Sequence, residues 1–166
     1  MGKPVFFVQK RPGYKGNLFN LIKFRTMSVE TIRMGKILDD DKRLTLLGRF
    51  LRNSSIDELP ELINILKGDL SFIGPRPLLE KYIPLYTKEQ FKRHDVKPGL
   101  TGLAQVSGRN LISWDEKFAL DNWYVRNQSF LLDMKIFFKT IIKVIQMEGI
   151  NSSDNMTMKE FVGRKK

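Results

Sequence analysis

The sequence contains no cysteine and a single histidine, His94, in 166 residues. Without cysteine the chain can have no disulfide, no thiolate nucleophile and no zinc–thiolate site. One histidine confines any Ser-His-Asp relay to the neighbourhood of His94 and excludes a metal site built from several histidines. Acid–base or covalent chemistry must therefore fall mainly to carboxylates, hydroxyls and lysines.

Long apolar runs are also absent. No stretch reaches the roughly 18 to 20 apolar residues of a membrane-spanning helix, and no secretory signal opens the chain. Because 42% of the residues are hydrophobic, the length is sufficient for one compact domain with its own core. The sequence as it stands therefore predicts no integral membrane helix.

Acidic residues are scarce relative to basic ones, and the first 29 positions contain none. The chain carries 29 Lys and Arg against 18 Asp and Glu, a formal net charge of +11. Such an excess attracts nucleic acid, anionic lipid or phosphorylated substrates, and charge alone does not choose among them. The basic residues of the first 29 positions are Lys3, Lys10, Arg11, Lys15, Lys23 and Arg25.

Hydrophobic periodicity predicts an α+β fold, a mainly helical single domain that begins with a β-hairpin. Residues 4–9 and 18–24 are β-branched and aromatic runs joined by a turn-rich segment, which is typical of a hairpin. Apolar spacing predicts helices over residues 43–52 and about 57–67. Gly68 is expected to end the second of these.

The second half of the chain predicts further helices joined by Gly/Pro-rich loops. A short helix is expected over residues 88–94, and a capping box at Ser113 opens a helix to about Asn127. Ser129 caps a last helix that ends at Gly149. We place Trp123 in the core, with an interfacial position as the alternative. The catalytic domain would then cover residues 1–150, followed by a polar, loosely ordered tail over 151–166.

Asp57 and Glu58 form an adjacent acid pair in the most informative segment of the sequence. Pro60 has no N–H and is accommodated only in the first turn of a helix, so both acids fall at a helix N-terminus. That end favours ionised carboxylates and bound phosphate. A carboxylate held ionised beside phosphate-binding groups suits attack on phosphorus. Taken alone, however, the pair is better explained as ordinary capping acids.

Basic residues in rigid segments favour a phosphate-binding site around the acid pair over ordinary capping acids. Two of them end the hairpin, one lies five residues before Asp57, and two lie in Gly/Pro-rich loops. Guanidinium groups bind phosphate through two parallel hydrogen bonds, and loops fixed by proline and glycine hold such groups still. Each could singly be a solvated surface charge. The candidates are Lys23, Arg25, Arg52, Arg76 and Arg109.

Five segments, in order, resemble the successive motifs of the monotopic bacterial sugar transferases, which are polyprenyl-phosphate phosphoglycosyl transferases. The resemblance covers nearly the whole chain. Residues 76–86 are most similar to the short members that transfer diacetylbacillosamine phosphate or a related N-acetylated sugar phosphate. The five segments are Lys23–Met27, Ser55–Glu61, Lys67–Pro77, Lys97–Arg109 and Trp123–Asp133.

The resemblance implies transfer of a sugar 1-phosphate from a UDP-sugar to a polyprenyl phosphate such as undecaprenyl phosphate, with release of UMP. This reaction is the first membrane step in assembling a capsule, exopolysaccharide, O-antigen or glycoprotein glycan. Asp57 aligns with the family's nucleophile, which forms an aspartyl-phosphosugar intermediate, and Glu58 with the second acid. Mg²⁺ is implied as cofactor, held by Asp57 and Glu58. The substrate-binding candidates are Lys23, Arg25, Arg52, Arg76, Arg109 and Asp133.

Members of this family carry an N-terminal apolar re-entrant helix that dips into one leaflet, and this sequence begins just after it. We therefore expect a truncated, soluble chain of an enzyme from the cytoplasmic face of the bacterial inner membrane. Lys135, Lys139 and Lys143 lie beside a wide apolar face in residues 130–148, as in a helix lying on anionic lipid. Packing of that face on the core explains the pattern equally well.

Two other classes of function compete with this interpretation. A basic nucleic-acid-binding domain would explain the charge, but no helix-turn-helix, RNP or zinc signature is present. A non-catalytic scaffold of the same fold is the other, and the intact Asp57–Glu58 pair argues against it. We expect a UDP-sugar, a polyprenyl phosphate and an anionic membrane surface as partners, and no nucleic acid.

Overall fold

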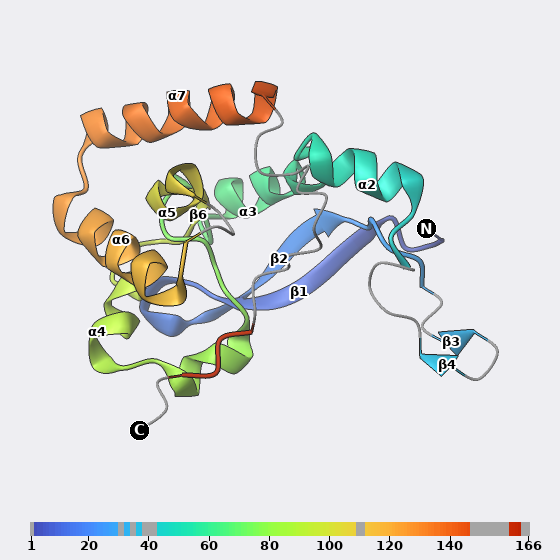
Figure 1. The fold of residues 1–166 in the computed structure, drawn as a ribbon, viewed down its shortest axis with the longest axis horizontal. Coiled ribbons are helices and arrows are strands. Elements are labelled where there is room, and N and C mark those ends of the chain that lie inside the picture. Colours follow the sequence, from blue (N-terminus) through green and yellow to red (C-terminus); the bar gives the residue numbers. More distant parts are fainter. Residues whose placement is uncertain are drawn as a thin grey trace.

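In the computed structural model the described residues are 2–29, 32–33, 36–37, 43–108, 112–146 and 160–163. A long two-stranded hairpin runs through the middle of the molecule, with helices gathered along it (Figure 1). In chain order the strands are β1 (Phe6–Pro12), β2 (Leu18–Phe24), β3 (Ile32–Arg33), β4 (Lys36–Ile37), β5 (Ser71–Ile73) and β6 (Gly99–Thr101). The helices are α2 (Leu46–Asn53), α3 (Glu61–Lys67), α4 (Lys88–Phe91), α5 (Leu103–Ser107), α6 (Trp114–Asn127) and α7 (Phe130–Gln146).

The predicted hairpin is confirmed, but its first strand is shifted, because β1 begins at Phe6 and continues to Pro12, into the segment expected to form the turn. β1 and β2 pair antiparallel, with Gln9 opposite Leu21 and Arg11 opposite Phe19. Because side chains alternate along a strand, Gln9, Arg11, Leu21 and Lys23 share one face of the ribbon. Leu21 is buried on that face. The hairpin therefore presents two basic residues beside a buried leucine.

Helix α2 begins against the end of β2. Thr45 caps it by accepting a hydrogen bond from the Gly48 amide at 2.9 Å. A Cβ atom on Gly48 would lie 1.8 Å from the carbonyl oxygen of Thr26, so only glycine allows this approach. The contact fixes the residues that lead from α2 into the acid pair.

The expected helix from about Asp57 to Lys67 is wrong at its start. Residues Ile56–Glu58 form one 3-10 turn, and α3 begins only at Glu61. Pro60 has no N–H to donate to the Ile56 carbonyl, which accepts from Leu59 at 3.1 Å instead. Gly68 ends α3 as expected, with φ 81°. The two acids thus lie in a tight turn ahead of the helix.

Asn64 attaches α3 to the hairpin. Its side-chain oxygen accepts from the Ile22 amide at 3.1 Å, and its side-chain nitrogen donates to the Asn20 carbonyl at 2.8 Å. Asn64 is buried. Helix α3 therefore lies along the free edge of β2.

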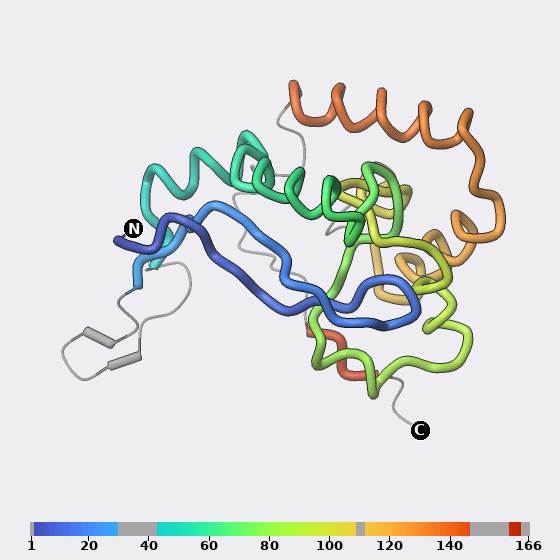
Figure 2. Tube along the Cα trace, turned by 180° about the vertical axis from the view of Figure 1, so that it is seen from behind, coloured from blue at the N-terminus to red at the C-terminus, as the bar shows by residue number. Residues whose placement is uncertain are grey.

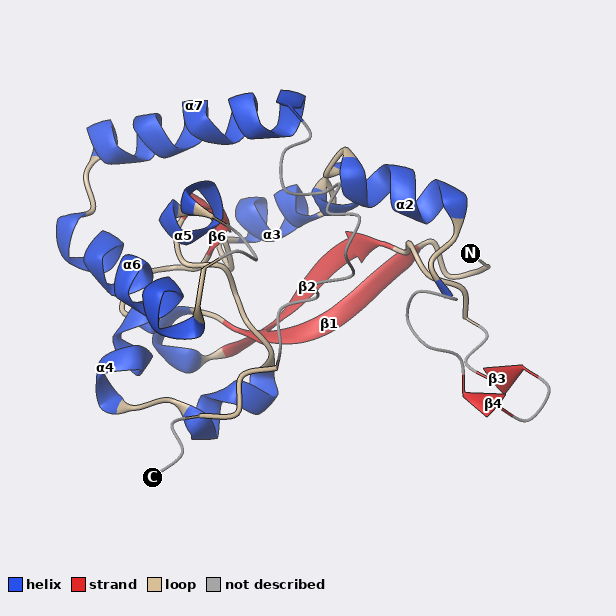
Figure 3. Cartoon of the chain, viewed as in Figure 1, coloured by secondary structure: helices blue, strands red, loops and turns tan. Residues whose placement is uncertain are grey.

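A parallel pair of short strands, β5 and β6, lies where the sequence predicted only Gly/Pro-rich loops. The three glycines around it pack backbone on backbone: a Cβ on Gly99 would meet the Gly74 amide at 2.1 Å, and one on Gly102 the Gly74 carbonyl at 2.1 Å. Ile73 joins the buried core with Val106. Figure 3 shows the helices α5, α6 and α7 gathered on this side.

Helix α6 confirms the capping box at Ser113, whose side chain accepts from the Glu116 amide at 3.2 Å. The assignment of Trp123 to the core is wrong, because its side chain is 49% exposed while the next residue, Tyr124, is buried. The packed side of α6 is formed by Phe118, Asp121, Asn122 and Tyr124, and Trp123 does not belong to it.

One residue of the segment that the sequence predicted as a loose tail, Phe161, is packed in the core, while its neighbours Glu160 and Val162 are exposed. Phe161 is buried among the rings of Tyr82, Trp114 and Phe118. Figure 2 shows this segment lying against the lower part of the molecule, remote in sequence from its neighbours. An aromatic cluster thus holds the end of the chain to α6.

Helix α7 packs one side on the core, as the second alternative predicted, and contact of its other side with lipid stays a prediction. Leu132, Ile136 and Thr140, spaced by four residues, turn toward the core, where Ile136 is buried. Other large apolar side chains of α7 are exposed: Phe130, Leu131, Phe138, Ile142 and Ile145. The expected end at Gly149 lies outside the described residues. Within the part of the chain that is described, no helix is long and apolar enough to cross a membrane.

Candidate active site

The acid pair lies at the meeting point of β2, the 3-10 turn and α3. Asp57 is nearly buried, with 9% of its surface exposed. Lys23 reaches from β2 to Glu58 Oε1 at 2.7 Å and to Glu61 Oε1 at 3.0 Å. A single ammonium thus bridges the turn and the first residue of the helix. Lys23 and Glu58 are the residues that the sequence predicted here, and the structure brings them into contact.

Arg76 approaches the same carboxylate from the opposite element. Its Nη2 donates to Glu58 Oε1 at 2.5 Å. The loop that carries Arg76 follows β5 and is fixed by the close packing of Gly74 on Gly99. Both cations therefore bind one oxygen of Glu58, and Oε2 keeps no hydrogen-bond donor within the described part of the chain.

A buried ion pair lies behind Arg76. Arg93 donates through Nε and Nη2 to Asp121 Oδ2 at 3.0 and 2.7 Å, and both side chains are almost fully buried. The same Nη2 donates to the Arg76 carbonyl at 2.7 Å. This pair ties the Arg76 loop to α6. Sequence reasoning missed both residues, because nothing local marks two distant charges as partners.

The two acids of the pair have opposite electrostatic environments. Burial alone would raise the pKa of Glu58, but the charges of Arg76 and Lys23 and their hydrogen bonds hold that pKa well below its usual range. Burial raises the pKa of Asp57, and the neighbouring charge of Glu58 raises it further. Lys23, Arg52 and Arg76 oppose that rise. The structure thus separates a glutamate whose ionised form is favoured from an aspartate that is costly to ionise.

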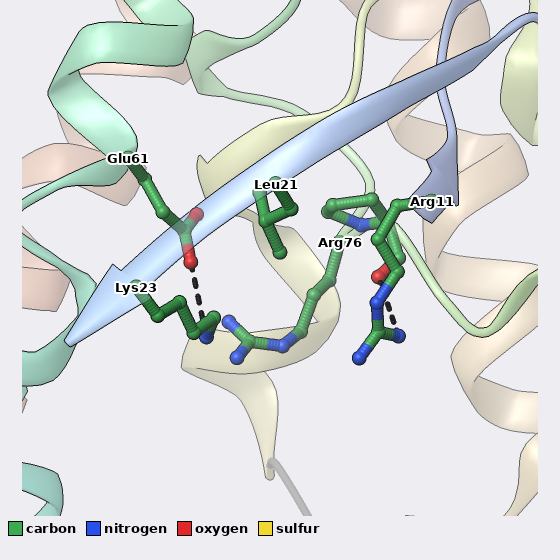
Figure 4. A pocket seen from close by; sticks show the side chains of 6 residues that line it. Arg11, Leu21, Lys23, Glu61 and Arg76 are labelled. Carbon is green, nitrogen blue, oxygen red and sulfur yellow. Dashed lines mark hydrogen bonds and ion pairs between the residues drawn. The ribbon is translucent and has the colours of Figure 1, made fainter. Parts of the chain in front are cut away.

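A small pocket opens beside this cluster. It is lined by residues of both strands, α3 and the Arg76 loop, and Figure 4 shows three cationic ends in a row on one side of β2, with Glu61 reaching in from α3. Burial also raises the pKa of Glu61. The lining residues are Arg11, Leu21, Lys23, Glu61, Arg76 and Pro77.

The other predicted residues take different positions. Arg52 donates to the Thr26 hydroxyl at 2.9 Å, within electrostatic reach of Asp57. Arg25 turns back onto β1, where its Nε donates to the Pro4 carbonyl at 2.7 Å. Asp133 accepts from the Tyr124 phenol at 2.8 Å, between α6 and α7. Arg109 lies outside the described residues.

Two charged residues of the pocket were not among the sequence candidates. Glu61 follows Asp57 by four residues, a spacing that could have drawn attention to it. Arg11 stood out only as one of six basic residues in an acid-free segment. The face of β1 on which it lies becomes evident only once the pairing register is known.

The carboxylates suit a hard cation. Asp57 accepts no hydrogen bond from the residues the structure describes, so its oxygens and Oε2 of Glu58 remain available as metal ligands. Mg²⁺ in proteins is commonly bound by one or two carboxylates together with substrate phosphates and water. In the described ranges no three carboxylate or histidine side chains gather into a fuller metal site. The donor set therefore fits Mg²⁺ that is completed by substrate and water.

Comparison with known proteins identifies the class. The family described as "Bacterial sugar transferase" matches residues 1–147, and the chain belongs to this family. It is 56% identical over 163 residues to a Bacillus subtilis protein named as the sugar transferase EpsL, covering 98% of this chain and 81% of that protein. It is 39% identical to the exopolysaccharide production protein ExoY of Sinorhizobium fredii, covering 89% and 73% of the two chains.

A third relative carries a more specific name. The chain is 38% identical over 165 residues to the undecaprenyl-phosphate galactose phosphotransferase of Salmonella typhimurium. The match covers 89% of this chain but only 35% of that protein. The similarity thus spans about a third of the longer relative and includes the acid pair's segment of this chain.

Proposed function

We propose that this chain transfers a sugar 1-phosphate from a UDP-sugar to undecaprenyl phosphate in the synthesis of an exopolysaccharide or capsule. The observation that carries the proposal is the nearly buried Asp57 beside Glu58, with Lys23 and Arg76 bound to the second acid. Anion-binding groups and a carboxylate nucleophile are what transfer of a phosphoryl group requires. The names of the relatives from Salmonella and Sinorhizobium support the lipid acceptor and the pathway class.

In the first step a carboxylate oxygen of Asp57 attacks the β-phosphorus of the UDP-sugar. The new Asp57–phosphorus bond forms as the bond from that phosphorus to the bridging oxygen breaks, and UMP leaves with the bridging oxygen. The product on the protein is an acyl phosphate that carries the sugar. Dividing one difficult displacement into two easier ones is the general advantage of covalent catalysis.

In the second step a phosphate oxygen of undecaprenyl phosphate attacks the same phosphorus. The bond to Asp57 breaks, its carboxylate is restored, and the sugar is left on a lipid diphosphate. Glu58, held ionised, fixes Lys23 and Arg76 in place without competing for phosphorus. The two cations then face the charge that develops on the phosphoryl oxygens.

Mg²⁺ belongs to the proposal as cofactor. Asp57 and Oε2 of Glu58 would hold it, and when bound it would neutralise negative charge on the diphosphate. The residues themselves orient the phosphates and keep Asp57 away from water. Because Asp57 is nearly buried, its carboxylate is poorly solvated and is therefore a better nucleophile once ionised.

Contact with an anionic membrane surface also belongs to the proposal. Both α2 and α7 run along the upper side of the molecule in Figures 1 and 2, and both expose large apolar side chains. On α2 these are Leu46, Leu47 and Phe50. Apolar residues beside lysines are typical of surfaces that lie on anionic lipid. A lipid acceptor would be reached most directly from such a surface at the cytoplasmic face.

The covalent mechanism predicts a burst without acceptor. Protein, UDP-sugar and Mg²⁺ alone should release up to one equivalent of UMP, and the protein should gain the mass of one sugar phosphate. Adding undecaprenyl phosphate should remove that mass. Asp57→Asn should abolish both burst and adduct, whereas Glu58→Gln should slow turnover and still leave an adduct to be trapped.

Two outcomes would contradict the mechanism. An adduct mapped to Glu58 would exchange the roles of the acids, and turnover with lipid but no burst would exclude a covalent step. A panel of UDP-sugars should include galactose, glucose and N-acetylated amino sugars. The relatives' names mention galactose and exopolysaccharide, so they do not favour the diacetylbacillosamine members to which residues 76–86 are similar.

A further inference from the structure

Arg11 occupies an unusual position at the end of β1. Its Nη2 donates to the Gln9 side-chain oxygen at 2.7 Å and its Nη1 to the Pro77 carbonyl at 3.3 Å. Both acceptors are neutral. The Nε atom is buried and has no acceptor. An arginine side chain thus lines the pocket with part of its hydrogen-bonding capacity unused.

The charge of Arg11 is balanced only from a distance, by Glu61 on the other side of the pocket. Lys23 and Arg76, the other cations of the pocket, each contact a carboxylate. No acid contacts Arg11 anywhere in the described ranges. Burial first, and then the positive charge of Arg76, lower the pKa of Arg11 to about 10, although the charge of Glu61 opposes this shift.

A partly buried cation with no carboxylate in contact is costly unless a ligand supplies the missing charge. The missing partner must be an anion with several acceptor oxygens, because it has to satisfy a planar donor fork beside a second guanidinium group. Phosphoryl oxygens match this requirement. The pocket also adjoins the Lys23–Glu58–Arg76 cluster, where the proposed reaction takes place.

We propose that Arg11 is a phosphate-binding residue of this site, one that contacts phosphoryl oxygens of a substrate in the pocket between β1, β2 and the Arg76 loop. The proposal rests on the proposed function for the identity of the substrate. The phosphoryl oxygens belong to the UDP-sugar diphosphate or to the lipid acceptor's phosphate monoester. Both present the same oxyanion chemistry.

A purely structural role is the competing explanation, because Arg11 also braces the Pro77 loop against the hairpin. One substitution separates the two. Gln9→Glu keeps Arg11 and its contact and adds an internal carboxylate, so it should preserve the brace while competing with a bound phosphate. Arg11→Met removes the charge at similar volume. Lys10→Met is the matched control, since Lys10 is exposed and alternates to the opposite face of β1.

The first measurement needs no turnover. Thermal unfolding of each variant is followed with increasing inorganic phosphate or UDP. We expect Arg11→Met and Gln9→Glu to weaken the apparent affinity at least tenfold, and Lys10→Met to behave like the parent. Unchanged affinity in Gln9→Glu would overturn the proposal, and this holds even if Arg11→Met does not fold. Because this assay requires no UDP-sugar chemistry, its outcome is separate from that of the proposed function.

The second measurement identifies the source of the phosphate. A raised KM for the UDP-sugar in the UMP burst without acceptor, with the burst amplitude kept, would assign Arg11 to the donor diphosphate. A normal burst with a raised KM for undecaprenyl phosphate would assign it to the acceptor. If Gln9→Glu matches the parent in both half-reactions, Arg11 is a structural brace and the proposal fails.

Discussion

Replacing each acid of the pair with its amide should change the free energy of unfolding in opposite directions. Glu58→Gln removes the charge that two cations share at 2.7 and 2.5 Å. Hydrogen bonds between charged groups are worth about 1.5–3 kcal/mol each when one partner is lost. The side chains involved are 16–38% exposed, so solvent screens part of this energy. We expect a net loss of about 2 kcal/mol.

Asp57→Asn should cause no loss of stability, and a gain at neutral pH. Burial raises the pKa of Asp57, which means that the folded protein resists ionising it. The amide has nearly the same shape and removes that penalty. An aspartate that destabilises the fold at the pH where it works is a cost typical of catalytic groups.

The two effects should depend on pH differently. The raised pKa of Asp57 makes its ionised form costly above that pKa, so the gain from Asp57→Asn should vanish as the pH falls through it and the parent becomes neutral. The lowered pKa of Glu58 stabilises the fold above the unfolded value, about 4.3. That contribution should be lost only at more acidic pH.

Urea or thermal unfolding of the parent and both variants at pH 7 and near pH 5 measures these differences. For a chain of this length about 2 kcal/mol corresponds to a shift of roughly 4–8 °C in Tm. Equal losses in both variants, or a larger loss for Asp57→Asn, would refute the assignment of opposite environments. The UMP burst measured on the same samples separates activity from stability.

Other predictions concern the cations and the backbone. Arg76→Lys should slow UMP release at least about tenfold, or roughly 1.4 kcal/mol, because an ammonium cannot reproduce a planar fork; full activity would place Arg76 outside the site. The rate of UMP release should fall at acidic pH as Asp57 becomes protonated. Lys23→Met removes a charge that lowers the pKa of Asp57, so it should move this acidic limb of the pH–rate profile to higher pH. An unmoved limb would mean that Asp57 does not control it. Gly99→Ala should cost about 3 kcal/mol in urea unfolding, since its Cβ would lie 2.1 Å from the Gly74 amide, and an unchanged midpoint would contradict the close packing.

Elements with strong local signals could be predicted from the sequence. The hairpin follows from β-branched and aromatic residues on both sides of a turn, although the end of β1 and the pairing register could not be predicted in this way. The start of α6 follows from the side chain of Ser113 and its partner Glu116 three residues later. In each case the interacting residues are neighbours in sequence.

Elements that depend on distant contacts could not be predicted. Strand β5 exists only because β6 pairs with it, and the glycines that permit the approach look like loop residues in the sequence. Phe161 is buried because the rings of Tyr82, Trp114 and Phe118 surround it, although its own segment is polar. Tertiary contacts override local preference at such positions.

The same distinction between local signals and distant contacts applies to the residues of the candidate site. Lys23, Glu58 and Arg76 were predicted from residue type and motif order, and the structure brings them into contact. Arg25 was predicted on the same grounds, but β2 ends at Phe24, so strand alternation no longer controls where its side chain points. Arg11 was missed because the sequence does not show that its guanidinium group lines the pocket without a carboxylate in contact.

The Asn64 side chain has a wider consequence for the geometry of catalysis. A primary amide offers the same donor and acceptor as a peptide group, so Asn64 serves β2 as a third strand one residue long. It satisfies two backbone groups on that edge of β2, the Ile22 amide and the Asn20 carbonyl. Because its side chain has a fixed length, Asn64 also sets the distance between the strand that carries Lys23 and the helix that begins at Glu61. The spacing of charges around the acid pair is thus determined by a residue that itself carries no charge.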